Sequence, residues 1–350
     1  MAADLDDIVQ TIQRAVPLPQ RRAILLIGGF GRGEGGVLSV PGDGWRAFND
    51  YDLTILVDGY VDETVIPPLS VELARRLDID FVDIGVIQRR VLEGPPLDTI
   101  FAYELKAGHR VLDGPPDALH RMPAINPATL PLVEATRLLV NRGWGLVWAR
   151  LHLEEAVTDS ATFDRHRRRF TVNAMHKGVL AVGEAALLLA RRYDVSYRER
   201  ARRLAELELS STLGDQADEF RAAFLESTRF KLSPLIPDDG ADRLVDRWTR
   251  VGEWHEAMLR HVEAHRLGHR FGDWNCWSRA VMRQGFWSAL RRPRRFLSER
   301  SKGVGGGPFW LDRDHDFRRR LPALLYGHGG ERLGDDWRSS ARRQLEAWHP

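Results

Sequence analysis

The feature that most constrains this chain is a glycine turn between two short apolar runs. The first run and the turn read AILLIGGFGRGEGG at 23–36, and the second run reads FNDYDLTILV at 48–57. A short apolar run that ends in glycines is typical of a buried strand followed by a tight turn. The second run carries Asp50 and Asp52, and residues i and i+2 of a strand face the same side, roughly 6.5–7 Å apart. We therefore expect both carboxylates to face the glycine turn, while Tyr51 points into a core.

A turn of this kind beside two acids can hold a divalent cation and a polyphosphate together. Backbone N–H groups of a glycine turn bind phosphate oxygens, and carboxylates are the hard oxygen ligands that Mg²⁺ prefers. A D-x-D pair by itself is most often two solvent-facing acids, so its position after this turn is what favours a site.

The glycines also contain a G-x-G-x-x-G string at Gly31, Gly33 and Gly36, which alone is weak evidence for a dinucleotide-binding fold. That fold needs a helix directly after the turn and an acid near the end of the second strand. Here the second strand begins with the acid pair, so the dinucleotide interpretation is disfavoured.

The string GGFGRGE at 28–34, followed by the acid pair, resembles the nucleotidyltransferase superfamily to which DNA polymerase β belongs. The turn is most similar to that of the bacterial uridylyltransferases that modify the nitrogen-signalling PII protein. The resemblance covers roughly residues 20–90. Turn and acids are further apart here than in the family, and the Gly/Pro-rich stretch 37–47 has the composition of a loop insertion.

The resemblance implies that Asp50 and Asp52 bridge two Mg²⁺ ions and that a third carboxylate lies on a neighbouring strand. The run DIDFVDIGVIQ at 78–88 is rich in β-branched residues and predicts that strand. Asp83 matches the family wording best, and Asp80 is the competitor. Because 80 and 83 differ by an odd number, the two face opposite sides of a regular strand, and only one can join the pair.

The resemblance also implies a nucleotide site at the turn. The backbone of Gly28, Gly29, Gly31 and Gly33 is expected to hold the triphosphate, and Arg32 to offer it a forked donor. The implied reaction moves a nucleoside monophosphate from a triphosphate, with ATP as the expected donor, to an acceptor hydroxyl and releases pyrophosphate.

The chain is expected to have an α+β fold, in which a small mixed-sheet domain is followed by an all-helical domain. We expect the catalytic domain at 1–122 and a helical, acceptor-binding domain at 132–300, because three prolines between them make a stiff linker and the apolar period then changes to 3.6. An appendage rich in Arg and Gly is expected at 301–350.

Composition places the chain among globular proteins, with 43% apolar and 29% charged residues. The single cysteine, Cys276, excludes an internal disulfide and favours a reducing compartment. The N-terminus is acidic rather than signal-like, and no apolar run approaches the roughly 18 residues of a membrane span. A cytoplasmic location is expected.

The acceptor is the least determined part of the prediction. The order of a small catalytic domain and a helical domain resembles the aminoglycoside nucleotidyltransferases, which implies a small hydroxylated acceptor. The arginine-rich stretches leave a protein or RNA acceptor open, although solvated helix faces are the favoured interpretation. A binding module related to the nucleotidyltransferases of toxin–antitoxin systems is the alternative of a different class.

One further cluster is a histidine series at His261, His265 and His269, which falls on one helix face. Two histidines at i and i+4 can bind zinc. No cysteine or acid cluster lies close in sequence, so a polar helix face is favoured.

Overall fold

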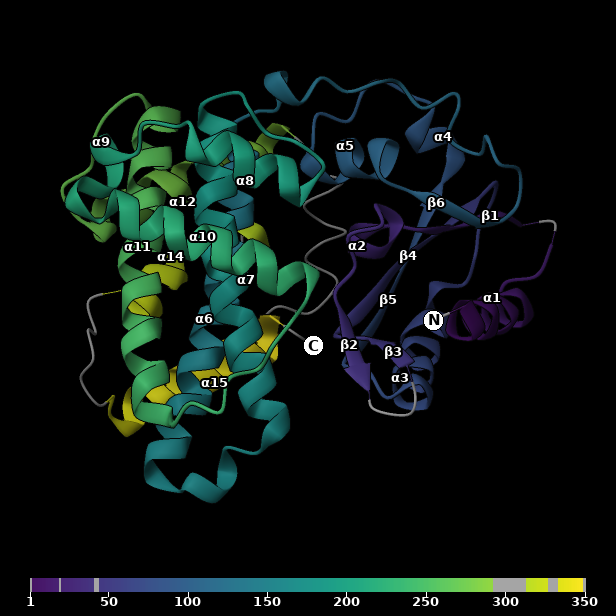
Figure 1. Ribbon diagram of the computed structural model, residues 1–350. Coiled ribbons are helices and arrows are strands. Elements are labelled where there is room, and N and C mark those ends of the chain that lie inside the picture. Colours follow the sequence, from purple (N-terminus) through teal and green to yellow (C-terminus); the bar gives the residue numbers. More distant parts are fainter. Residues whose placement is uncertain (1, 19, 41–43, 292–312, 327–332, 349–350) are drawn as a thin grey trace. The chain divides into compact units, whose positions relative to one another are not determined.

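The computed structural model describes residues 2–18, 20–40, 44–291, 313–326 and 333–348 (Figure 1). The chain forms two compact units that interleave along the sequence. Unit 1 comprises 1–134, 190–207 and 225–235, and unit 2 comprises 135–189, 208–224 and 236–350. Unit 1 holds the strands and unit 2 is helical in its described part, which confirms the predicted α+β class.

The centre of unit 1 is a four-stranded mixed sheet with the order β5-β4-β1-β6. Strand β1 pairs antiparallel with β4 and with β6, whereas β4 and β5 run parallel. The bounds are β1 (Arg21–Leu26), β4 (Asp50–Val57), β5 (Phe81–Gln88) and β6 (Arg110–Asp113). The three apolar runs that the sequence marks as strands are therefore neighbours in one sheet.

Helices cover both faces of this sheet (Figure 1). Because strand side chains alternate, Ile24 and Leu26 of β1 pack with α1 (Ala2–Ala15) and α3 (Ile66–Leu77) on one face. Ala23 and Leu25 face the other side, toward α5 (Ile100–Ala107) and the residues that follow β6. The shorter elements of unit 1 are η1 (Glu63–Val65), α4 (Arg89–Leu92), η2 (Pro127–Thr129) and α8 (Tyr197–Ala205).

The connection from β1 to β4 contains a short helical turn and a two-stranded hairpin. The glycine turn forms a single helical turn, α2 (Gly28–Gly31), and the residues that follow it up to Gly36 belong to no helix or strand. The stretch 37–47 is a separate antiparallel hairpin of β2 (Val37–Val40) and β3 (Gly44–Ala47), rather than a plain loop. The insertion thus pairs with itself and leaves β1 and β4 adjacent.

Unit 2 is built around α7 (Arg165–Leu189), which packs against α11 (Ala241–Leu267). By length and composition α7 could cross a membrane, but 89% of its most apolar window is buried in the structure. Its apolar character is accounted for by this central position. The other helices are α6 (Val133–Thr158), η3 (Ser160–Thr162), α9 (Ser210–Leu213), η4 (Gly214–Gln216), α12 (Trp274–Arg291), α14 (Arg313–Leu325) and α15 (Asp335–Trp348); α10 (Ala217–Leu232) spans both units.

The C-terminal segment, expected as a loose appendage, contains packed helices in its described part. Leu321 of α14 and Trp337 and Leu345 of α15 are buried within unit 2. The glycine-rich stretch at 303–307 and the arginine pairs near 291–295 lie wholly or largely outside the described residues.

Candidate active site

The register of β4 and β5 brings the predicted acids to one face of the sheet. Asp52 lies directly opposite Asp83, and Asp50 lies opposite Phe81. Register partners in parallel strands face the same side, so all three predicted acids share one face. Asp50 and Asp52 are half-buried and Asp83 is exposed.

Asp80, the competing third acid, precedes β5 and is not part of the strand pair. Its backbone N–H donates to the carbonyl oxygen of Asn49 at 3.0 Å. The register therefore makes Asp83, rather than Asp80, the strand neighbour of Asp52.

The glycine turn meets the acid strand at Gly28. The backbone N–H of Ile27 donates to the carbonyl oxygen of Asp52 at 2.9 Å, which holds the start of the turn on β4. A Cβ built on Gly28 would lie 2.0 Å from Oδ2 of Asp52, and the φ angle of Gly28 is +60°. Only glycine avoids both the overlap and the left-handed strain at this position. The turn thus lies directly beside the carboxylate of Asp52.

The amides of the turn divide into two sets. Those of Gly31 and Gly33 donate within the turn, to the carbonyl oxygens of Ile27 and Phe30 at 2.9 and 3.2 Å. They are therefore engaged and not directed at a ligand. The amides of Gly28 and Gly29 stand in the first turn of α2, where a helix leaves its N–H groups without an internal partner. Of the four glycines predicted to hold the triphosphate, these two have amides that the hydrogen bonds described within the turn do not use.

Arg32 has a different partner from the one the resemblance implied. Its Nη1 donates to Oε2 of Glu104 at 2.9 Å, and the side chain is 5% exposed. The guanidinium carbon lies 5.1 Å from the centre of the Tyr197 ring. Arg32 is therefore bound inside unit 1 by a carboxylate and an aromatic ring, instead of being presented to a nucleotide.

Glu104 is the centre of a polar cluster that the sequence analysis missed. Its carboxylate accepts from Arg32, from Arg200 and from the hydroxyl of Tyr193, the last at 2.6 Å. Burial by itself raises the pKa of Glu104, but the charges of Arg200 and Arg32 and the bond from Tyr193 outweigh it and hold that pKa below its usual value. The only sequence signal was a single acid on the mostly apolar helix at 100–107.

Glu34, which follows the glycine turn, is hydrogen-bonded to the start of α8. It is 5% exposed and accepts from the Ser196 hydroxyl and from the backbone N–H of Tyr197, each at 2.8 Å. Ser196 is itself the N-cap of α8, where its side chain accepts from the backbone N–H of Glu199. The turn is consequently held on either side of Gly33, by Arg32 and by Glu34.

The donor set fits a magnesium ion that arrives with a nucleotide. Among the described residues, no group of three or more His, Cys, Asp or Glu side chains is arranged to hold a metal ion. Mg²⁺ is, however, commonly bound by one or two carboxylates together with waters and substrate phosphates. Asp52 and Asp83, side by side on one face, supply such a pair.

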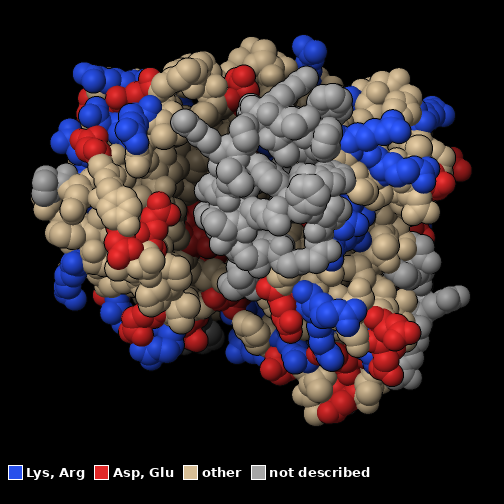
Figure 2. Space-filling view, turned by 180° about the vertical axis from the view of Figure 1, so that it is seen from behind, with Lys and Arg blue, Asp and Glu red and all other residues tan. Residues whose placement is uncertain are grey.

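In the described part of the chain, several arginines of the basic tracts are paired with acids. Arg167 pairs with Glu155 at 2.6 Å, and Arg319 and Arg320 pair with Asp316 at 2.6 and 2.8 Å. Figure 2 shows basic and acidic side chains interleaved on the face that it presents. This arrangement supports solvated, ion-paired helix faces over a single basic surface for nucleic acid.

No protein-family model matches the sequence. No curated protein matches it either. Among solved structures, spectinomycin adenyltransferase AAD(9) from Enterococcus faecialis, crystallised with ATP and spectinomycin, is similar with a TM-score of 0.42 and 10% identity. The likeness covers 72% of this chain and 98% of that one. A likeness at this level assigns neither a family nor an activity to the chain.

Proposed function

We propose that this protein is a Mg²⁺-dependent nucleotidyltransferase. It transfers a nucleoside monophosphate, with ATP as the preferred donor, to a hydroxyl group of a small molecule and releases pyrophosphate. The observation that carries this proposal is the contact between the Asp52 carboxylate and Gly28, with Asp83 as the strand neighbour of Asp52. The glycine turn offers backbone N–H groups to the phosphates of a nucleotide, and the neighbouring carboxylates offer oxygen ligands to its cation.

Each residue has a defined part in the reaction. Gly28 and Gly29 offer backbone N–H groups to the phosphates, and Asp50, Asp52 and Asp83 would hold the metal. When bound, the metal would neutralise charge on the phosphates and orient them. The acceptor oxygen forms a bond to the α-phosphorus, the bond from that phosphorus to the bridging oxygen of the β-phosphate breaks, and pyrophosphate leaves. Asp83, the most exposed of the three acids, takes the proton of the acceptor hydroxyl.

The test is pyrophosphate release from each of the four NTPs with Mg²⁺ and a panel of hydroxylated acceptors. Aminocyclitols such as spectinomycin are the first acceptors to try. We expect Asp52→Asn to reduce turnover by more than 100-fold and Asp83→Asn by a similar factor, as removal of a catalytic carboxylate does.

Asp80→Asn is the matched control, because it removes a nearby carboxylate that stands outside the strand pair. It should leave turnover within about 3-fold of the parent protein, a difference of less than 1 kcal/mol. Unchanged turnover in Asp52→Asn, or loss in Asp80→Asn with activity kept in Asp83→Asn, would contradict the assignment. NTP binding without any turnover would instead favour the binding-module alternative.

A further inference from the structure

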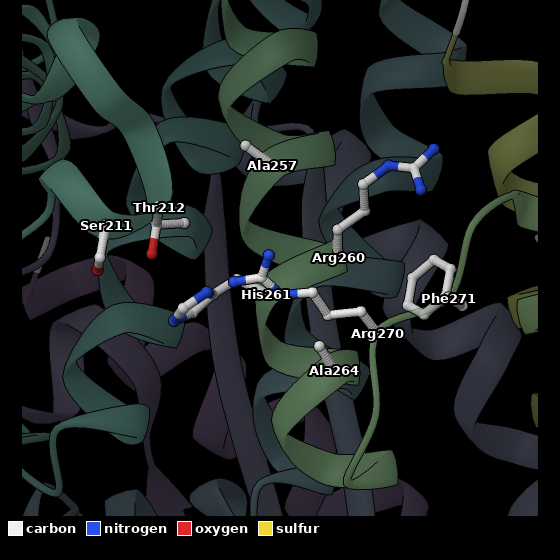
Figure 3. A pocket seen from close by; sticks show the side chains of 8 residues that line it. All are labelled: Ser211, Thr212, Ala257, Arg260, His261, Ala264, Arg270 and Phe271. Atoms are coloured by element: carbon white, nitrogen blue, oxygen red, sulfur yellow. The ribbon is translucent and has the colours of Figure 1, made fainter.

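Unit 2 contains a pocket of about 320 Å³, and all of its lining residues belong to that unit (Figure 3). Ser211 and Thr212 of α9 stand on one side of it, and His261 of α11 on another. Arg270 and Phe271 follow the end of α11 and complete the wall. The volume is at the lower end of the range for pockets that bind small molecules.

The lining of this pocket is basic. It includes Arg260, His261 and Arg270, and none of its side chains is acidic. The pKa of His261 is lowered first by its partial burial and then by the positive charges of His265 and Arg270. Arg270 therefore stands close enough to His261 for the two to interact electrostatically, and Figure 3 shows its guanidinium directed toward the imidazole.

The two arginines differ in how far their charge is already compensated. Arg260 donates to Glu256 at 3.0 Å, and its guanidinium carbon lies 4.3 Å from the centre of the Trp274 ring. Among the described residues no carboxylate pairs with Arg270, which is exposed at the pocket. Arg270 thus leaves a forked, positively charged donor for a ligand.

We propose that this pocket binds the phosphate group of a small phosphorylated molecule or of inorganic phosphate. Arg270 is the charged, forked donor, and the hydroxyls of Ser211 and Thr212 are further hydrogen-bond partners from α9. A phosphate has enough oxygens to accept from all three side chains at once, whereas a carboxylate has only two. Phe271 provides an apolar edge for the organic part of a phosphate ester.

The experiment is titration calorimetry of the whole chain with inorganic phosphate, AMP and acetate. It is done in EDTA, so that a magnesium–nucleotide complex cannot form at the acids. We expect phosphate and AMP to bind and acetate to bind at least about tenfold more weakly, with AMP binding more tightly if a phosphate ester is the natural ligand. Arg270→Gln should weaken phosphate binding by about tenfold or more.

A matched control separates Arg270 from other surface arginines. Arg243→Gln removes an arginine that is 84% exposed on helix α11 and should leave the affinity unchanged. No phosphate binding at millimolar concentration, or equal affinity in Arg270→Gln and the parent protein, would overturn the proposal. None of these results depends on nucleotide transfer.

Discussion

Replacing Gly28 with alanine tests the contact on which the proposed site depends. The added Cβ would lie 2.0 Å from Oδ2 and 2.8 Å from Cγ of Asp52. Cβ atoms essentially never approach other heavy atoms more closely than 3.0 Å. Either the turn or the Asp52 carboxylate must therefore move by about 1 Å. A misplacement of that size in a catalytic site can lower the rate about 100-fold. The left-handed backbone adds a loss of about 1–2 kcal/mol in stability.

Gly33→Ala is the matched control for this substitution. Gly33 has a similar φ of +72°, but a Cβ there would meet no atom within 4 Å. Both variants should lose about 1–2 kcal/mol in free energy of unfolding, measured in urea. Only Gly28→Ala should also lose about 100-fold in kcat/KM for pyrophosphate release, or about 2.7 kcal/mol of transition-state stabilisation. Equal kinetic losses in the two variants would refute the reasoning.

Two further predictions concern stability. Glu104→Ala leaves Arg32 and Arg200 buried without their shared carboxylate, so we expect the free energy of unfolding in urea to fall by about 3–5 kcal/mol. The control Glu72→Ala removes a carboxylate from an exposed ion pair and should lower the free energy of unfolding by less than about 1 kcal/mol. Because the pKa of Glu104 is lowered on folding, its contribution should be complete above the unfolded pKa of about 4.3 and should disappear as pH falls through the folded value. His255 is buried, and its pKa is lowered to about 4. The unfolded chain takes up that proton first, near pH 6.5, so stability should fall by up to about 3 kcal/mol between pH 6.5 and 4, and His255→Asn should flatten this slope in urea midpoints.

Much of unit 1 was predictable because its signals are local. Short apolar runs marked β1 and β4, and the i, i+2 spacing put Asp50 and Asp52 on one face. The odd separation of Asp80 and Asp83 left two alternatives, since periodicity cannot tell where a strand begins. The start of β5 at Phe81 and its register with β4 decide which acid neighbours Asp52.

The features that escaped prediction depend on pairs far apart in sequence. Glu104 and Arg200 are separated by 96 residues, and Glu34 and Ser196 by 162. No periodicity within one element encodes such a pair, because the same acid could equally face solvent. The grouping of α8 with the sheet in unit 1, rather than with the helices around it in sequence, follows from the same long-range contacts.

These long-range pairs change how the sequence of the turn should be interpreted. Gly28 is required where the backbone meets Asp52, whereas Arg32 and Glu34 are engaged in hydrogen bonds with Glu104 and with the start of α8. A guanidinium that left Glu104 to reach a phosphate would give up a buried ion pair, although Arg200 and Tyr193 would still hold that carboxylate. The proposed binding of a triphosphate therefore relies on backbone amides and on the cation that the acids would hold. The charged residues of the motif hold the turn rigid, and this preorganisation is the contribution they can make to catalysis.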